Sequence, residues 1–293
     1  MDIDSAVRGM CIDEYFSYHL YRSLAGKPFV GENLRETLLK ASEDEYRHYL
    51  FWRSIVGECS SSISMFKMFI YTVMFYLFGL TALLKILEAK ERSAKAIYKE
   101  IAKLKHELKE EVEKMILDEE KHEKEFLSSI DEGRVRYIGA ITLGISDALI
   151  ELTGIYTGSL GAFENTLSAG LTGLLAGIAA SISMGIASYT QAKNEGRANP
   201  GLAAIYTLIA YISVALLLAT PYFIINNLMK AFIAMVVIAL AIVSYLTFYV
   251  AILHNRSYIK EFGETAIMIF GVSILLYILG STLGKILGIK PTD

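Results

Sequence analysis

The chain has 293 residues, of which 54% are hydrophobic and 20% charged, with a formal net charge of −3. A soluble domain averages about 45–50% apolar and ~25% charged residues, so this composition is too apolar for one. Four prolines, two cysteines and no basic block exclude collagen, a disulfide-rich scaffold and a nucleic-acid-binding protein.

The charges are unevenly distributed along the chain. Residues 1–133 hold 43 Asp, Glu, Lys and Arg side chains, whereas residues 134–293 hold 16. This split predicts a charged domain, residues 1–132, followed by a membrane domain, residues 133–293. The first domain is rich in Glu, Lys, Leu, Ile and Tyr, which favours helices. Its first helix is expected to end at AGKP, and its second to run from after Gly31 to Gly57.

Two of the five histidines of the chain occur in the pattern Glu-x-x-His, as Glu45 with His48 and Glu119 with His122. The i, i+3 spacing places both side chains of each pair on one helix face, where they can converge on one point. A single such pair on a charged helix is most simply a solvated Glu and His. Two pairs in matched register predict a metal site.

The remaining carboxylates follow the same register. Glu14 precedes Glu45 by 31 residues, and Glu88 precedes Glu119 by 31 residues. A shift of 74 residues therefore carries Glu14, Glu45 and His48 onto Glu88, Glu119 and His122. A Glu from each of two helices and Glu-x-x-His from each of two others form the ligand set of a carboxylate-bridged di-iron bundle. Glu91 is a further candidate. The predicted ligands are Glu14, Glu45, His48, Glu88, Glu91, Glu119 and His122.

Two segments of the first domain do not fit a simple bundle. Residues 63–84 carry one charge, Lys67, and are almost long enough to cross a bilayer. A crossing here would separate the two halves of the site, so we interpret 63–84 as a buried bundle helix that also contacts the membrane or a partner. The turn expected near residues 100–106 has no Gly or Pro. A continuous helix there would complete the bundle by exchange with a second chain.

The second domain contains five stretches of about 20 mostly apolar residues, the length needed to cross a bilayer. The predicted spans are 137–163, 166–192, 198–220, 231–253 and 265–284. Small residues in the second span favour close helix packing. Five spans are awkward for an internally symmetric carrier, so we expect a homodimer.

Lys and Arg in the connecting segments predict the orientation of the spans. Six fall on one side: Arg134, Arg136, Lys193, Arg197, Arg256 and Lys260. Three fall on the other: Lys230, Lys285 and Lys290. The bias places residues 1–132 in the cytoplasm and the C-terminus outside.

Two acids, Asp147 and Glu151, lie in the first span, four residues apart and therefore on one helix face. A carboxylate near the bilayer centre costs at least ~2.5 kcal/mol, so the pair predicts an ion or proton site, with simple neutralisation by a neighbouring helix as the alternative. Met184 in the second span offers a thioether, which suits ferrous iron better than hard cations. Alone, such a methionine most often only packs.

Both domains resemble known families. Residues 10–128, through Glu14, Glu45, His48, Glu88, Glu91, Glu119 and His122, resemble the rubrerythrin branch of the ferritin-like proteins. Residues 134–290 resemble the vacuolar iron transporter family, through SDALIELTG in the first span and SISMGIASY in the second. The fusion is similar to the membrane-bound ferritins of prokaryotes. Ser188 stands where the transporter family often has Glu, and the loop after the second span lacks the acidic insertion of eukaryotic members.

The resemblance implies an all-α protein, with a cytoplasmic ferritin-like four-helix bundle followed by a five-helix transmembrane domain. It implies a homodimer in the cytoplasmic membrane of a prokaryote, which exports ferrous iron in exchange for protons along a path that includes Asp147 and Met184. Manganese is a second candidate cargo. The bundle would hold a di-iron centre that captures or senses iron. The alternative is a membrane-anchored ferroxidase or peroxide-reducing oxidase. Cys11 and Cys59 stand alone, so we expect reduced thiols and no cysteine-rich iron centre.

Overall fold

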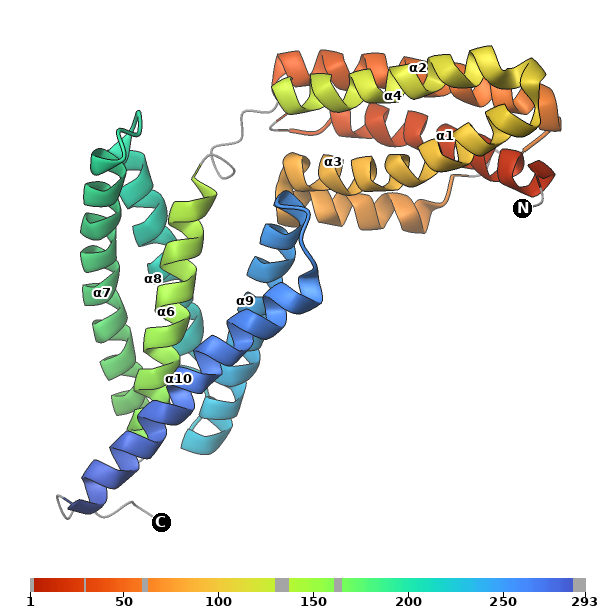
Figure 1. The fold of residues 1–293 in the computed structure, drawn as a ribbon. Helices are drawn as coiled ribbons and strands as arrows, with labels where there is room; N and C mark the ends of the chain where they lie inside the picture. Colours follow the sequence, from red (N-terminus) through yellow and green to blue (C-terminus); the bar gives the residue numbers. More distant parts are fainter. Residues whose placement is uncertain (1–2, 29, 60–62, 130–136, 161–164, 287–293) are drawn as a thin grey trace. The chain divides into compact units, whose positions relative to one another are not determined.

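The structure is a computed structural model, which describes residues 3–28, 30–59, 63–129, 137–160 and 165–286. All regular structure within these ranges is helical, which confirms the all-α prediction for this part of the chain. The chain divides into two compact units, residues 1–131 and 132–293, and each is described by itself (Figure 1).

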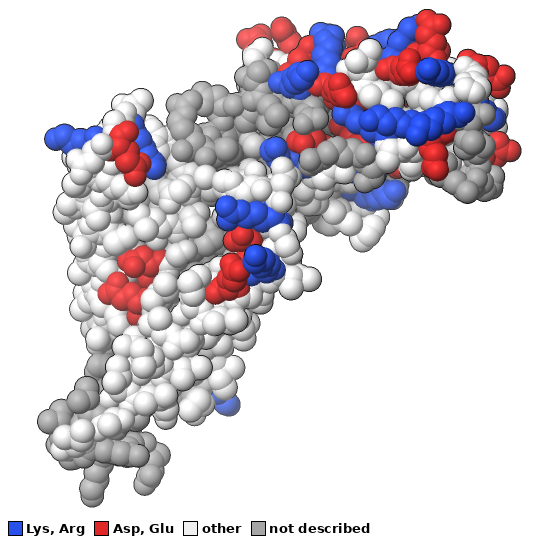
Figure 2. Space-filling model, in the orientation of Figure 1, with Lys and Arg blue, Asp and Glu red and all other residues white. Residues whose placement is uncertain are grey.

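The described residues of the first unit form four long helices: α1 (Ile3–Ala25), α2 (Glu32–Val56), α3 (Met65–Leu104) and α4 (Lys109–Ser129). Helix α1 packs along α2, and α4 packs against α2 and α3 (Figure 1). Gly31 and Gly57 cap α2 at its two ends, as the sequence predicts. Gly57 adopts φ 77°, a left-handed conformation that glycine enters without steric cost. Charged side chains cover the visible face of this unit (Figure 2).

Helix α3 bends sharply at Gly79, whose φ of 81° and ψ of 174° are not helical. The kink separates a first half, Met65–Phe78, from a second half that enters the bundle core through Leu80, Leu83, Leu84 and Leu87. The predicted helix over 63–84 is therefore divided by a kink that the sequence did not predict, and its expected contact with the membrane or a partner stays a prediction. Met65, at 77% exposed, and Phe66, at 72%, lie open on one face of that half. Because the run of apolar residues has no break except a single glycine, its pattern resembles a continuous buried helix.

The turn expected near residues 100–106 is present without glycine or proline. Helix α3 ends at Leu104, Lys105 takes φ −121° and ψ 87°, and a short 3₁₀ turn, His106–Leu108, leads into α4. The helix does not run on, so α4 returns to the bundle of its own chain and packs on α2 and α3. Completion of this bundle does not require exchange of a helix with a second copy.

The cysteines differ from the prediction of reduced thiols. Cys11 of α1 and Cys59, which follows α2, form a disulfide with their Cα atoms 6.3 Å apart. Both are buried in a cluster that also contains Tyr49, Trp52 and Tyr98. The disulfide ties the start of α1 to the segment after α2.

In the second unit, the part that the structure describes forms five apolar helices: α6 (Ile138–Ser159), α7 (Thr166–Asn194), α8 (Pro200–Ile224), α9 (Leu228–Leu253) and α10 (Tyr258–Ile286). Each is long and apolar enough to cross a membrane. Their surface is mostly free of charge in the view of Figure 2. By length and composition α3 is a sixth such helix, so the number of spans is not fixed by hydropathy alone. The loop cations Arg134, Arg136 and Lys290 lie outside the described residues.

Close approach between helices of this unit depends on glycine, as the small residues of the second span predict. A Cβ added to Gly173 of α7 would lie 2.3 Å from the ring of Tyr156 on α6. One added to Gly177 would lie 2.7 Å from the Cβ of Ala215 on α8. Ser273 of α10 donates a 2.8 Å hydrogen bond to Thr153 of α6. These contacts pack α6 between α7, α8 and α10.

Candidate metal centre

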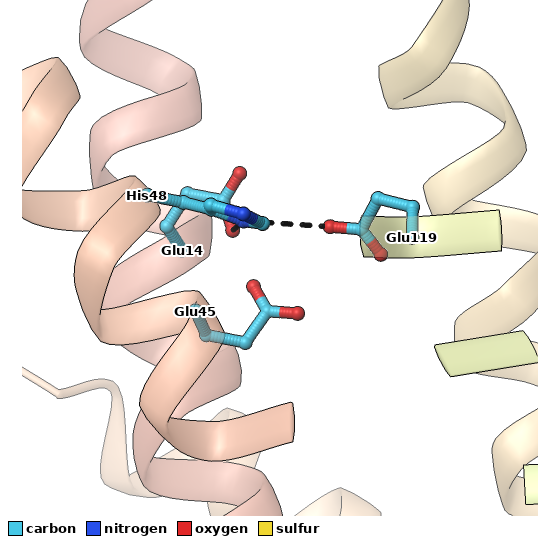
Figure 3. Close-up of side chains that lie close together, drawn as sticks. All are labelled: Glu14, Glu45, His48 and Glu119. Atoms are coloured by element: carbon cyan, nitrogen blue, oxygen red, sulfur yellow. Dashed lines mark ion pairs between the residues drawn. The ribbon is translucent and has the colours of Figure 1, made fainter. Parts of the chain in front are cut away.

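Four acidic and histidine side chains from three helices of the first unit converge on one point. They are Glu14 of α1, Glu45 and His48 of α2, and Glu119 of α4 (Figure 3). One ligand atom from each lies within 4.8 Å of the others. All four side chains are buried, with 2–5% of their surface exposed. Metal ligation is the simplest reason to bury three carboxylates together, because a charged group in a protein interior must be neutralised or paired.

The two histidines of the Glu-x-x-His pairs are held in the same way. Nε2 of His48 lies 3.3 Å from Asp118 Oδ2, and Nε2 of His122 lies 2.9 Å from Asp44 Oδ2. A carboxylate on one ring nitrogen fixes the orientation of the ring and leaves the other nitrogen free to bind metal. Asp44 and Asp118 each precede a ligand glutamate directly, and the shift of 74 relates them too.

The free ring nitrogens point into the carboxylate cluster. His48 Nδ1 lies 3.7 Å from Glu119 Oε1 and 3.9 Å from Glu14 Oε2. His122 Nδ1 lies 3.8 Å from both Glu45 Oε1 and Glu119 Oε2. Glu119 therefore lies between the two imidazoles, with one oxygen near each ring.

Two tyrosines bond to carboxylates across the bundle. The hydroxyl of Tyr98 on α3 donates to Glu14 on α1, and the hydroxyl of Tyr21 on α1 donates to Glu91 on α3, at 2.5 Å. A shift of 77 carries Glu14 to Glu91 and Tyr21 to Tyr98. The internal repeat thus pairs Glu14 with Glu91.

The shift of 74 had paired Glu14 with Glu88 instead. Glu88 lies one turn earlier on α3, with Oε2 3.5 Å from the amino group of Lys85. The cavity beside the cluster has a volume of about 220 Å³, and Glu91 lines it together with Glu14, Glu45 and Glu119. Glu88 does not line this cavity. The geometry therefore places Glu91 in the position of the fourth carboxylate.

The carboxylates share protons in the absence of metal. Burial and the neighbouring charges of Glu119 and Glu14 raise the pKa of Glu45 well above its ordinary value. Burial alone would raise the pKa of Glu14, but the neighbouring Glu45 side chain and the charge of His48 lower it to about 2. Protons thus supply part of the positive charge that a bound cation would bring.

The histidines supply the rest of this charge. Burial alone would lower the pKa of His48, but its interaction with Glu14 and the charge of Glu119 raise it to about 9. The pKa of His122 is raised in the same way, by Glu119 and Asp44 against the effect of burial.

The donor atoms could hold a metal ion. Glu45 Oε1, His48 Nδ1, Glu119 Oε2 and His122 Nδ1 are buried, and none of these four atoms has a hydrogen-bond partner within the described residues. Unpartnered buried polar atoms are costly, and those aimed at one point require a ligand. Carboxylate oxygens with imidazole nitrogens suit iron, manganese or zinc. The residues of the cluster fit such ions without any change of fold.

Three of the predicted membrane residues lie on the first two helices of the second unit. Asp147 and Glu151 are half-buried on one face of α6, and Glu151 accepts a 2.6 Å hydrogen bond from the hydroxyl of Tyr211 on α8. Met184 of α7 packs against the core cluster that contains Ala148 and Leu149 of α6. Ser188 of α7 accepts a hydrogen bond from Thr207 of α8, at 2.8 Å.

Several residues around these sites had not been singled out from the sequence. They are Tyr21, Asp44, Tyr98, Asp118, Thr207 and Tyr211. The two repeat shifts would have identified the first four, since each has its counterpart at the same offset as a predicted ligand. No comparable signal marks Tyr211, which lies in an apolar span among other aromatic residues.

Comparison with known proteins gave no match to any protein-family model, to any curated protein or to any solved structure.

Proposed function

We propose that this chain transports ferrous iron across a membrane, with manganese as a second candidate cargo, and that its first unit binds two metal ions. The observation that carries the proposal is the buried cluster of Glu14, Glu45, His48 and Glu119 in a chain with five apolar helices after it. Buried carboxylates and imidazoles that converge on one point indicate a metal site, and the apolar helices indicate a membrane protein. The cluster would capture iron or sense its concentration.

The donor set supports iron or manganese in the first unit. Glu14, Glu45, Glu91 and Glu119 would hold the ions through their carboxylates, and His48 and His122 would do so through Nδ1. Asp44 and Asp118 would hold the two rings in place. Bound iron would supply redox chemistry, while the chain itself supplies the ligands, the dry surroundings and the positions of the protons.

The acids of α6 support a transport path in the second unit. Two carboxylates on one face of an apolar helix are costly in a bilayer, and a simple anchor has no use for them. Tyr211 orients Glu151 through its 2.6 Å bond and leaves the other oxygen of that carboxylate for a proton or an ion. We expect Asp147 and Met184 to bind the cation and Glu151 to carry the proton that moves in exchange.

The proposed arrangement is a homodimer in the cytoplasmic membrane of a prokaryote. The bias of Lys and Arg in the loops supports a cytoplasmic first unit and an external C-terminus. One face of α7 is exposed along its length at helical spacing, and this face would contact lipid or the second copy. Its exposed residues are Leu167, Leu171, Leu175, Ile178, Ile182 and Ile186.

The test is metal flux into proteoliposomes that carry the full chain in their membrane. Ferrous iron is added outside the vesicles, and a proton-sensitive dye is enclosed inside them. Asp147→Ala should abolish iron flux and the accompanying proton flux. Glu264→Ala is the matched control, because this acid of α10 is 59% exposed and pairs only loosely with Lys260. Iron flux at the wild-type rate in Asp147→Ala would overturn the transport proposal.

A membrane-anchored oxidase is the second candidate function, and the surroundings of Tyr98 favour it. Tyr98 bonds to Glu14 and stacks on Trp52 with 5.5 Å between the ring centroids. Such aromatic rings beside a redox metal can carry electrons. Oxygen or peroxide consumption on addition of ferrous iron to the full chain, lost in Glu45→Ala but retained in Asp147→Ala, would support this function.

A further inference from the structure

The first half of α3, Met65–Phe78, has one apolar face that no part of the described chain covers. Seven large side chains on this face are between 37% and 77% exposed. They follow one another at helical spacing and lie within less than half of the helix circumference. They are Met65, Phe66, Phe69, Ile70, Val73, Tyr76 and Leu77.

The opposite face of the same half-helix packs on the first unit. Met68, Tyr71, Met74 and Phe75 belong to or pack against the cluster that contains Phe16 and Leu20 of α1. Tyr71 lies 5.6 Å from the ring of Phe16, centroid to centroid. The half-helix is therefore anchored to the bundle along one side, and its exposed side is a fixed feature of the unit.

This half-helix is too short to cross a bilayer. Its 14 residues extend about 21 Å, whereas the hydrocarbon core is about 30 Å thick. The helix is interrupted at Gly79, and the second half is tied into the bundle by Tyr98 and Glu91. A continuous crossing through α3 would break both bonds.

Charge and rim residues favour a lipid surface over a protein partner. No acid occurs between Glu58 and Glu88, and Lys67, the one charged residue of this half-helix, lies off the apolar face, 5.9 Å from the ring of Phe16. At the edge of that face, Lys27 lies 6.0 Å from the ring of Tyr76, a combination typical of helices at the headgroup level of anionic membranes. An interface with a second protein normally includes polar pairs, for which this face offers only the Tyr76 hydroxyl.

The sequence also keeps this unit close to a bilayer. Eight residues, 130–137, separate α4 from the first apolar helix of the second unit, α6. Eight residues span at most about 29 Å when fully extended. The unit that carries the apolar face is thus joined by a short connection to a helix long and apolar enough to cross a membrane.

We infer that Met65–Phe78 lies in the plane of the membrane, with the face of Met65, Phe69 and Val73 buried at the boundary between headgroups and acyl chains. The contact would hold the metal-binding unit in one orientation on the bilayer. The inference does not depend on which metal the cluster binds or on whether the second unit transports.

The test uses the single tryptophan of the chain, Trp52, which is buried and serves as the baseline. The full chain is reconstituted in vesicles that contain phosphatidylcholine brominated near the headgroup end of its acyl chains. Phe69→Trp should add emission that these lipids quench and that aqueous iodide does not reach. Leu117→Trp, at a site on α4 that is 63% exposed, is the matched control and should respond to iodide alone.

Three results would overturn the inference. Iodide quenching of Phe69→Trp without lipid quenching would place this face in water. Protection from both quenchers would mean that a protein, such as a second copy, covers it. Stronger quenching by lipids brominated deep in the acyl chain would indicate a helix that crosses the membrane. Each variant should unfold at the same temperature as the wild type, which shows that its added tryptophan reports on the native fold.

Discussion

At the scale of single residues, the cluster is organised as two related halves. Each half has a Glu-x-x-His pair whose histidine Nε2 contacts an aspartate. Each half also has a glutamate that accepts a hydrogen bond from a tyrosine of the other half. The sequence alone predicted the convergence of Glu14, Glu45, His48 and Glu119, because the spacing within each helix is fixed. It did not separate Glu88 from Glu91, since the two lie one turn apart on α3 and the sequence pattern places both on the same helix face.

The two acids of α3 give a matched pair of variants. Glu91→Gln should weaken binding of one metal ion by about 10–100-fold, because it removes a carboxylate from the cavity. Glu88→Gln should leave affinity within a few-fold of wild type. Titration of the full chain with ferrous iron under anaerobic conditions measures both. Equal losses in the two variants would contradict the assignment of Glu91.

Metal binding should release protons at neutral pH. His48, with a pKa raised to about 9, is protonated without metal at pH 7, and its Nδ1 must lose that proton to bind an ion. The affinity should therefore rise as pH increases from 6 towards 9. Calorimetry in buffers of different ionisation enthalpy counts the released protons. A binding heat that does not depend on the buffer would contradict this proton balance.

At the scale of elements, helix ends were predictable where glycine marks them, as at Gly31 and Gly57. The spans α6, α7 and α9 begin and end within four residues of the predicted bounds. Helix α8 runs through Pro221 to Ile224, because proline near a helix end removes only one hydrogen bond. The kink of α3 was missed, because a lone glycine in an apolar run has the same pattern whether it is helical or not.

The kink makes Gly79 sensitive to substitution. Gly79→Ala should destabilise the first unit by about 1–3 kcal/mol, because φ 81° with ψ 174° is a region that only glycine enters freely. Gly9→Ala is the contrasting variant, since Gly9 lies within helix α1 and a Cβ added there meets nothing within 4 Å. It should stabilise by up to about 1 kcal/mol. Thermal unfolding followed by Trp52 fluorescence compares the two, and a stable Gly79→Ala would refute the kink.

At the scale of the whole molecule, composition predicted a charged part and an apolar part, and the chain has two compact units. Hydropathy could not decide the role of α3, because Met65–Phe78 is apolar on both faces and only packing distinguishes the bundle side from the exposed side. The pairing of Cys11 with Cys59 also escaped prediction, since 48 residues separate them and their approach depends on how α1 packs on α2.

The disulfide gives a direct chemical prediction. Thiol titration of the denatured chain without reductant should find no free thiol, and titration after reduction should find two. In the chain-entropy model a loop of this length stabilises the fold by about 4 kcal/mol, so reduction should lower the unfolding midpoint. Disulfides are rare in most cytosols, which makes the result informative about the compartment as well. Two thiols without reductant would refute the bond.

We propose that the first unit holds two metal ions in one buried cluster. The measurement that tests it most directly is the number of ferrous ions bound per chain after desalting, in full-length protein carrying Asp147→Ala so that the membrane helices do not contribute. We predict two ions, none when Glu45→Ala and Glu119→Ala are added, and two when Glu113→Ala and Glu120→Ala, exposed acids of α4, are added instead. Two ions retained after loss of Glu45 and Glu119 would contradict the claim.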